Sequence, residues 1–403
     1  MNLPDANSTT VQVFVNAWSI YEDANNNGIS HFLEHMFFKW WRKYHNSREV
    51  AVVVDSFGGE FNAYTGKDIA SYYVKSAPEY IYQSMDVLSD MLIHASFPQE
   101  DMETEKWVVI QEMKMYEDNP QRLMSLNASR RFYGDNSYGR SIIGSEETVM
   151  NITRENLLDW QHNLYNKNNL TLVVVGRLPD EEDLKAKVSE YFDNIPNGNR
   201  YEKPAFDISN ITKEKSSYYE KWTEQNHLLL RCNGPYRDAD DMVKQKEFAA
   251  MVLAMIVFGG NMSSRLFQEI REKKWLCYYI HSGFWDSLVK DAGIGNVYIS
   301  AGLDKAQRDI AIEDIYVQID LLGREGITEA EFVKAKWYKL GWLQMWIETT
   351  DQRAEWIGPE YLQDGKILDL EYMYKLYDSV TLAEVNNAIK WMNREDFYLY
   401  YIK

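Results

Sequence analysis

Two stretches of roughly 200 residues each mix short strand-like patterns with longer helix-like patterns, and a polar, turn-rich segment separates them. The separating segment begins with the turn residues DNIPNGN at 193–199 and stays polar to Ser217. Each stretch is long enough to bury a core of its own. We therefore predict an α+β (α/β) protein with two structurally similar domains, at 1–198 and 217–403, and a linker at 199–216. Each domain is expected to hold a mostly antiparallel sheet with helices packed on one face.

Hydrophobic periodicity assigns elements within the two stretches, because a period of two indicates a strand and a period of 3.6 indicates a helix. In the first stretch we expect strands at 11–17, 71–74 and 170–175, and helices at 29–43, 48–56, 79–94, 102–116 and 154–164. In the second stretch we expect strands at 217–219, 227–231 and 296–301, and helices at 243–257, 265–273, 305–323 and 329–346.

Composition excludes several classes of protein. The net charge is -18, so a nucleic-acid binder, which needs a basic face, is not expected. No stretch approaches the ~20 apolar residues of a membrane span, and no signal peptide is visible at the N-terminus. Two cysteines, Cys232 and Cys277, cannot form a disulfide framework or a thiolate zinc cluster. These features favour a cytoplasmic protein.

The segment GISHFLEHM at 28–36 carries the most specific chemistry in the chain. His31 and His35 are four residues apart, so on a helix they lie on one face, one turn from each other. Two imidazoles in this arrangement can bind one zinc ion, and Glu34 lies beside them as a potential general base. The order His-x-x-Glu-His is the reverse of the commoner His-Glu-x-x-His zinc helix.

A catalytic zinc site needs a third protein ligand and keeps a fourth position for water. Glu105 and Glu112 are seven residues apart on an expected helix, so both can project from the same face. Periodicity alone does not decide which of them binds the metal, and each by itself is equally compatible with a solvated surface carboxylate.

Together these residues resemble the inverted-motif zinc peptidases of family M16, and the resemblance covers essentially the whole chain. His31-x-x-Glu34-His35 is followed by an acid at Glu112. Further similar segments are FGGEFNAYT at 57–65, MYEDNP at 115–120, FGGNMSSRLF at 258–267 and the stretch from Arg271 to Tyr278.

The resemblance implies a role for each matching residue. His31, His35 and Glu112 would be the ligands of one zinc ion per chain, Glu34 the general base, and Glu105 a residue that supports a ligand. In the second half, Arg271 would hold a substrate carbonyl and Tyr278 would donate a hydrogen bond to the oxyanion of the tetrahedral intermediate.

The resemblance also implies a substrate and partners. The strand around Asn62 and Ala63 would add an extended peptide to a sheet edge through main-chain hydrogen bonds, which read sequence weakly. The expected activity is a metalloendopeptidase that cleaves unfolded peptides or flexible tails in a chamber between the two domains. Such chains pair into homodimers or into heterodimers with a related subunit. The alternative is a non-catalytic or weakly active subunit that binds peptides or assembles with a partner.

Several tryptophans stand where members of this family usually carry glycine. The clearest cases are Trp18, Trp41 and Trp275, and the weaker ones are Trp107 and Trp337. Glycine serves where φ is positive or where backbones approach closely, and tryptophan suits neither role. We therefore hypothesise that the gene comes from a lineage that reads UGA as glycine.

Overall fold

The structure is a computed structural model that describes residues 1–202, 204–285 and 294–403. The chain forms two compact units, neither of which is continuous in the sequence. The first consists of Met1–Met115, Asn136–Pro204 and Trp346–Leu368, and the second of Tyr116–Asp135, Ala205–Met345 and Asp369–Lys403. The domain boundaries and the linker inferred from the sequence stay predictions.

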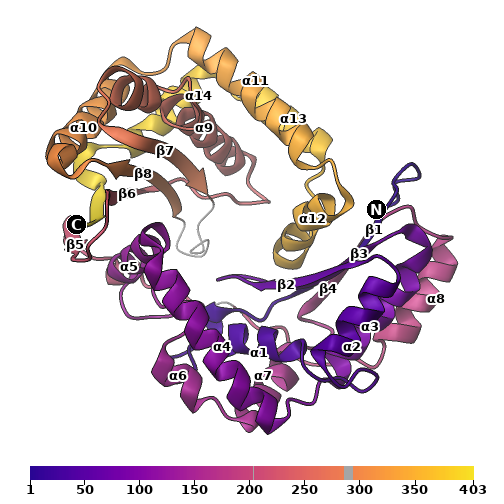
Figure 1. The fold of residues 1–403 in the computed structure, drawn as a ribbon. Coiled ribbons are helices and arrows are strands. Elements are labelled where there is room, and N and C mark those ends of the chain that lie inside the picture. The colour runs from indigo at the N-terminus through magenta and orange to yellow at the C-terminus, as the bar shows by residue number, and fades with distance from the viewer. Residues whose placement is uncertain (203, 286–293) are drawn as a thin grey trace. The chain divides into compact units, whose positions relative to one another are not determined.

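The first unit is built on an antiparallel sheet with strand order β2-β3-β1-β4 (Figure 1). Its strands are β1 (Thr9–Val15), β2 (Glu60–Thr65), β3 (Ala70–Ser76) and β4 (Leu170–Gly176). The helices of this unit are α1 (Ile29–Phe37), α2 (Ser47–Ser56), α3 (Ile81–His94), α4 (Gln99–Asp118, which runs on into the second unit), α6 (Glu146–Asn151), α7 (Arg154–Leu164), α8 (Glu181–Phe192) and α12 (Thr350–Asp364).

Strand β1 is buried along its whole length, which shows that both faces of this sheet are covered. Alternate residues of a strand point to opposite faces. Thr10 and Gln12 bond to α12 on one face, through a 2.9 Å contact between the Thr10 and Thr350 hydroxyls and a 2.8 Å bond from Gln12 to Glu355. The apolar residues Val11, Val13 and Val15 therefore point to the other face.

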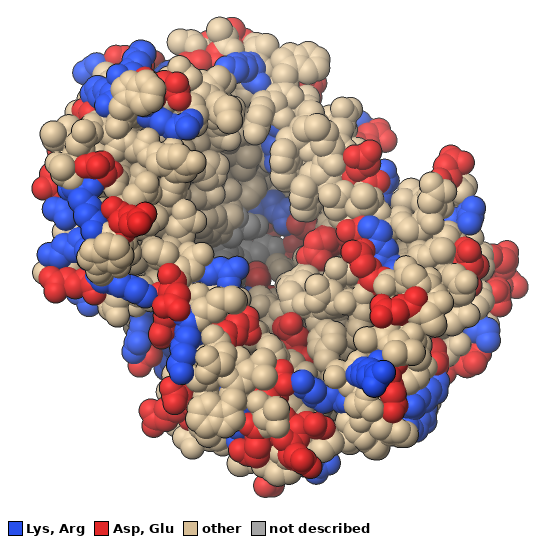
Figure 2. All heavy atoms as spheres, in the orientation of Figure 1, with Lys and Arg blue, Asp and Glu red and all other residues tan. Residues whose placement is uncertain are grey.

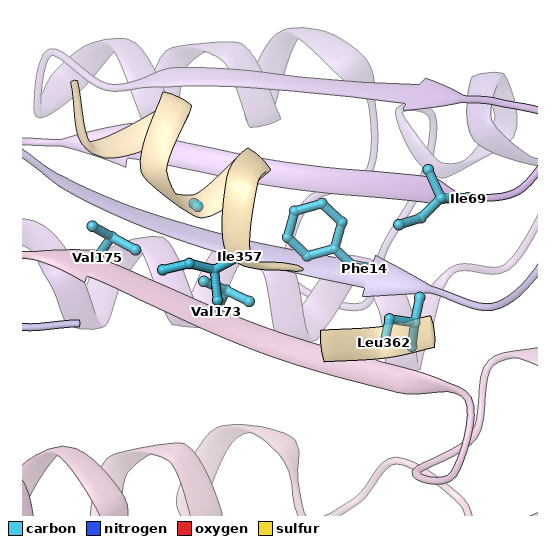
Figure 3. Packing of buried hydrophobic residues seen from close by; sticks show 7 residues of the cluster. Phe14, Ile69, Val173, Val175, Ile357 and Leu362 are labelled. Carbon is cyan, nitrogen blue, oxygen red and sulfur yellow. The ribbon is translucent and has the colours of Figure 1, made fainter. Parts of the chain in front are cut away.

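Helix α12 comes from the second half of the sequence but packs on this first sheet (Figure 3). Its buried side chains Ala354, Ile357 and Leu362 form one cluster with side chains of the sheet and of the loop before β3: Phe14, Ile69, Val173 and Val175. Gly358 lets the helix approach the sheet, because a Cβ at this position would overlap the Phe14 ring.

The second unit holds a sheet with strand order β5-β9-β6-β8-β7, in which only the β5–β9 pair is parallel. Its strands are β5 (Ser216–Tyr219), β6 (Asn226–Gly234), β7 (Cys277–Trp285), β8 (Gly295–Leu303) and β9 (Tyr398–Ile402). Its helices are α5 (Pro120–Tyr133), α9 (Met242–Phe258), a π-helix (Phe267–Lys273), α10 (Arg308–Glu325), α11 (Glu329–Trp346), α13 (Leu370–Ser379) and α14 (Leu382–Ala388).

Helix α5 is the counterpart of α12, because it comes from the first half of the sequence and packs on the second sheet. Leu123, Met124 and Ala128 of α5 form a buried cluster with Tyr400 and Ile402 of β9. Asn119 caps the start of α5 by accepting bonds from the backbone N–H groups of residues 121 and 122. Each half of the sequence thus supplies one helix to the sheet of the other half.

The predicted fold class is confirmed, since the protein is α+β with two helix-covered sheets. One predicted boundary is wrong: the helix expected over 29–43 ends at Phe37. The chain turns there because the Trp41 side chain is buried and its indole N–H donates to the Phe37 carbonyl at the helix end. No helix within the described ranges has the length and apolar character needed to cross a membrane.

We expect Gly358→Ala to destabilise the first unit by about 1–3 kcal/mol, because the added methyl group must displace the Phe14 ring in a filled core. Urea denaturation followed by circular dichroism measures the loss. The matched control is Gly341→Ala on α11, where a Cβ meets no atom within 4 Å. That control should gain up to about 1 kcal/mol from helix propensity. Equal effects of the two substitutions would contradict the packing argument.

Candidate metal centre

Helix α1 places the predicted motif on its less buried side. The apolar residues of the helix recur at spacings of three and four and are buried, namely Ile29, Phe32, Leu33, Met36 and Phe37. This pattern fixes the rotation of the helix, so that His31, Glu34 and His35 all lie on the opposite, partly exposed side.

A buried carboxylate holds the start of α1. Gly28, the N-cap, has a φ of 98° and offers no side-chain cap. Glu22 takes over this function, because its oxygens accept the backbone N–H groups of Gly28 at 2.8 Å and Ser30 at 2.9 Å. Burial raises the pKa of Glu22 to about 7. The sequence analysis missed Glu22, because an acid six residues before the N-cap glycine matches no recognised capping pattern.

Helix α4 brings Glu105 and Glu112 to the two histidines. Glu112 Oε2 lies 3.7 Å from His31 Nε2 and 3.3 Å from His35 Nε2. One donor atom from each of His31, His35 and Glu112 lies within 4.8 Å of the other two. Glu105 instead contacts His35 Nδ1 at 2.8 Å. The geometry thus separates the two acids that periodicity left equivalent.

Glu105 orients His35. Its contact with Nδ1 leaves Nε2 of the same ring directed toward Glu112, which is the usual arrangement for a metal-binding histidine supported by a carboxylate. Lys39 binds the other oxygen of Glu105 at 2.5 Å. Burial would raise the pKa of Glu105, but the bonds from His35 and Lys39 outweigh burial and lower it. Lys39, one turn beyond His35, is a contributor that the motif analysis did not single out.

The two histidines sit in opposite electrostatic settings. Burial, reinforced by the neighbouring His35, lowers the pKa of His31 to about 4, so its imidazole is neutral at physiological pH. Burial also disfavours the charged form of His35, but the hydrogen bonds to Glu105 and Glu112 outweigh it and raise the pKa of His35 to about 9. The paired carboxylates therefore create a negative potential that favours a cation at this position.

The residues fit a zinc ion. Two imidazoles and one carboxylate are a donor set found in catalytic zinc sites. His31 Nδ1 is buried and has no hydrogen-bond partner within the described part of the chain, so Nε2, which faces Glu112, is the nitrogen available for coordination.

Glu34 lies beside this group and is held by β2. The Thr65 hydroxyl, at the end of β2, donates a hydrogen bond to Glu34 Oε2 at 2.5 Å. Burial raises the pKa of Glu34, and the bond from Thr65 opposes that rise without cancelling it. The raised pKa suits a residue that accepts and then releases a proton near neutral pH. The sequence analysis quoted Thr65 as part of a motif but gave it no role.

Asn62 and Ala63 lie on β2, which is the last strand on one side of the described sheet. The Asn62 side chain accepts a hydrogen bond from the Ala63 backbone N–H at 2.9 Å. β2 therefore joins a sheet edge, at Asn62 and Ala63, to the Thr65–Glu34 contact two residues further along.

Comparison with known proteins identifies the family. The family model described as "Insulinase (Peptidase family M16)" matches residues 1–146, and the model described as "Peptidase M16 inactive domain" matches residues 151–338. The chain is 32% identical over 400 residues to the uncharacterized zinc protease YmxG of Bacillus subtilis, covering 99% of this chain and 93% of that protein.

The chain belongs to peptidase family M16. An uncharacterized zinc protease of Rickettsia felis is 30% identical over 392 residues, which cover 96% of this chain and 90% of that one. Solved structures agree in fold. A peptidase M16 inactive domain from Pseudomonas fluorescens matches with a TM-score of 0.87 at 19% identity, over 100% of this chain and 94% of that chain. A protease from Helicobacter pylori also has a TM-score of 0.87, at 18% identity, over 100% of this chain and 95% of that one.

Arg271 and Tyr278 of this M16 chain belong to the second unit, where both occupy irregular backbone. Arg271 lies on the π-helix, and its guanidinium is 4.5 Å from the Phe267 ring centre. Tyr278 lies at a register shift between β7 and β8 and is 73% exposed. π-Helices and β-bulges occur often at functional sites, because they redirect side chains. The roles given to both residues remain predictions.

The turn between these two residues contains Trp275 at a φ of 55°. The Leu276 N–H bonds to the Ile270 carbonyl at 3.1 Å, which closes the end of the π-helix in a form that usually has glycine at the position of Trp275. This finding supports the glycine hypothesis at position 275. Trp18 and Trp41, in contrast, are fully buried, and neither has a positive φ.

We expect Glu105→Gln to lower zinc affinity about 10- to 100-fold, because His35 loses the carboxylate that orients its ring. Competition with a fluorescent zinc chelator measures the affinity. Glu103→Gln is the matched control, since Glu103 is on the same helix but pairs with Lys106. An unchanged affinity for Glu105→Gln would remove Glu105 from the site.

We expect Trp275→Gly to stabilise the protein by about 1 kcal/mol, because it relieves a left-handed backbone conformation at an exposed side chain. Chemical denaturation measures the change. Trp337→Gly is the control, because Trp337 is similarly exposed but helical, so glycine there should cost about 0.5 kcal/mol. A loss of stability at both positions would argue against strain at residue 275.

Proposed function

We propose that this M16 chain is a zinc-dependent endopeptidase that cleaves unfolded peptides or flexible tails. The observation that carries the proposal is the convergence of His31, His35 and Glu112 within 4.8 Å, with Glu34 alongside. Zinc proteases among the relatives support the same assignment.

His31, His35 and Glu112 would hold the metal. Zinc, when bound, supplies a Lewis acid that polarises a carbonyl and lowers the pKa of a water molecule. Glu34 accepts a proton from the attacking water and returns it to the leaving amine. The Thr65 hydroxyl keeps one oxygen of Glu34 engaged, so the other oxygen is available for the proton. Glu105 and Lys39 keep the His35 ring in place.

β2 is the proposed docking strand for substrate. An extended peptide added to this edge, at Asn62 and Ala63, would use main-chain hydrogen bonds and would lie close to Glu34, which Thr65 of the same strand contacts. Because main-chain bonds do not distinguish side chains, the substrate class is defined by lack of structure and not by a fixed sequence.

Arg271 and Tyr278 complete the proposed machinery. Tyr278 would donate its hydroxyl proton in a hydrogen bond to the oxyanion, and Arg271 would bind a substrate carbonyl. The exposure of Tyr278 and its place at a strand irregularity support a side chain directed toward a ligand. We also propose that the chain works as a homodimer or pairs with a related subunit.

We expect the zinc-loaded protein to cleave an unstructured peptide of about 20–30 residues, a length chosen for lack of a stable fold. Mass spectrometry of the products measures the cleavage. Glu34→Gln should reduce the rate about 10²- to 10⁴-fold, because the general base is lost. A chelator should abolish activity, and zinc should restore it.

Two further variants separate the roles. Tyr278→Phe should lower kcat about 10²- to 10³-fold, because it removes one donor to the oxyanion. Glu103→Gln, on α4 but outside the metal group, should retain full activity. If one zinc binds per chain and no peptide is cleaved, the endopeptidase proposal fails and the chain is a peptide-binding or partner-assembling M16 subunit.

A further inference from the structure

A cavity of about 600 Å³ lies within the second unit, between the C-terminal end of α5 and strand β5. Pockets of 300–1,000 Å³ are typical of small-molecule sites. The wall includes two arginines, two acids and two aromatic rings: Arg130, Arg131, Asp135, Glu214, Tyr218 and Tyr400. All residues around this cavity belong to the second unit, whereas the candidate metal centre belongs to the first.

Arginines and acids on this wall are not matched one to one. Arg131 forms an ion pair with Glu214. Arg130 is exposed and has no ion-pair partner among the described residues, so its guanidinium is available to a ligand. Figure 2 shows that Lys and Arg are otherwise interspersed with Asp and Glu over the face in view.

Arg231 of β6 adds a third positive charge, and its burial makes it unusual. It is only 7% exposed, and its guanidinium packs 4.2 Å from the ring centre of Phe132 and 4.5 Å from that of Tyr133. Its hydrogen-bond acceptors are neutral, namely the Asn296 amide oxygen, 2.7 Å from Nε, and the Tyr133 hydroxyl. Among the described residues, no carboxylate lies within ion-pair distance of Arg231.

An uncompensated buried cation is costly, because burial removes water without supplying an opposite charge. A second cavity of about 20 Å³, enough for about one water molecule, is lined by Arg231 and shares Arg131, Glu214 and Tyr400 with the larger one. The charge of Arg231 is therefore directed toward the larger cavity and is screened little by solvent.

We propose that this cavity binds a small oxyanion, a carboxylate or a phosphate group, with Arg130 as its direct partner and Arg231 as a buried source of positive charge. Guanidinium groups suit such ligands, because their planar donors match two oxygens at once. Ser216 and Ser217 offer further hydroxyl donors on the β5 side. Glu214 opposes the anion and at the same time neutralises Arg131, so its charge limits the affinity. This site does not depend on the proposed peptidase activity.

Isothermal titration calorimetry with sodium citrate and with sodium phosphate, at constant ionic strength set by sodium chloride, tests the proposal. Saturable binding of one equivalent is expected from at least one of the two anions. Binding of citrate alone would identify a carboxylate ligand, and binding of phosphate alone a phosphate ligand. An absence of saturable binding by both at millimolar concentration would overturn the proposal.

Three variants distinguish a specific site from general charge. Arg130→Ala should weaken binding at least 10-fold, because a hydrogen-bonded charge pair is lost. Glu214→Gln should strengthen binding, because it removes a negative charge and releases Arg131. Arg122→Ala is the matched control on the same helix, since Arg122 is exposed, packs over Tyr116 and lies off the cavity wall.

The sign of the Glu214→Gln effect keeps the test decisive even if one arginine variant folds poorly. Weaker binding by Glu214→Gln, or equal effects of Arg130→Ala and Arg122→Ala, would show that the anion responds only to overall charge and would refute the site. Circular dichroism of each variant checks that the fold is retained.

Discussion

The packing of α1 against the core of the first unit is the constraint on which the candidate metal centre depends. Five buried apolar side chains fix the rotation of this short helix, and Glu22 fixes its start. Once the helix is held in this way, His31 and His35 have only one direction in which to project, toward α4. The ion pair between Lys39 and Glu105 and the contact between Glu105 and His35 then lock the ring of His35. A short helix without these supports would be only marginally stable.

The exchange of one helix between the halves gives each sheet part of its cover. α12 closes one face of the first sheet with Ala354, Ile357 and Leu362, and α5 packs on the second sheet. On the first sheet, the exchanged helix also reaches the strands near the site. Glu355 of α12 accepts hydrogen bonds from Gln12 of β1 and from Tyr64 of β2, and Tyr64 is adjacent to Thr65. The second half of the sequence thereby supports the strand that holds Glu34.

Irregular backbone marks the other residues to which the sequence gave a role. Arg271, Trp275 and Tyr278 occupy a π-helix, a left-handed turn and a strand register shift in succession. Such features cost free energy, and in a regular fold they persist only where surrounding contacts hold them. Their succession within one short segment agrees with the motif that drew attention to it, although no single propensity in the sequence indicates any of the three.

The sequence by itself determined the family, the α+β class, most helices and strands, and the candidate ligands, because hydrophobic period and the spacing of His31, Glu34 and His35 are local properties of the chain. It left Glu105 and Glu112 equivalent, since helical periodicity places both on one face but says nothing of what that face meets. Only the tertiary structure separated them, by setting Glu112 between two imidazoles and Glu105 behind one of them. The same holds for Glu22, Thr65 and Lys39, for the crossing of α5 and α12, and for the unpaired charge of Arg231. Each of these depends on contacts between elements that are distant in the sequence or differently directed in space, and such contacts leave no periodic trace in a single chain.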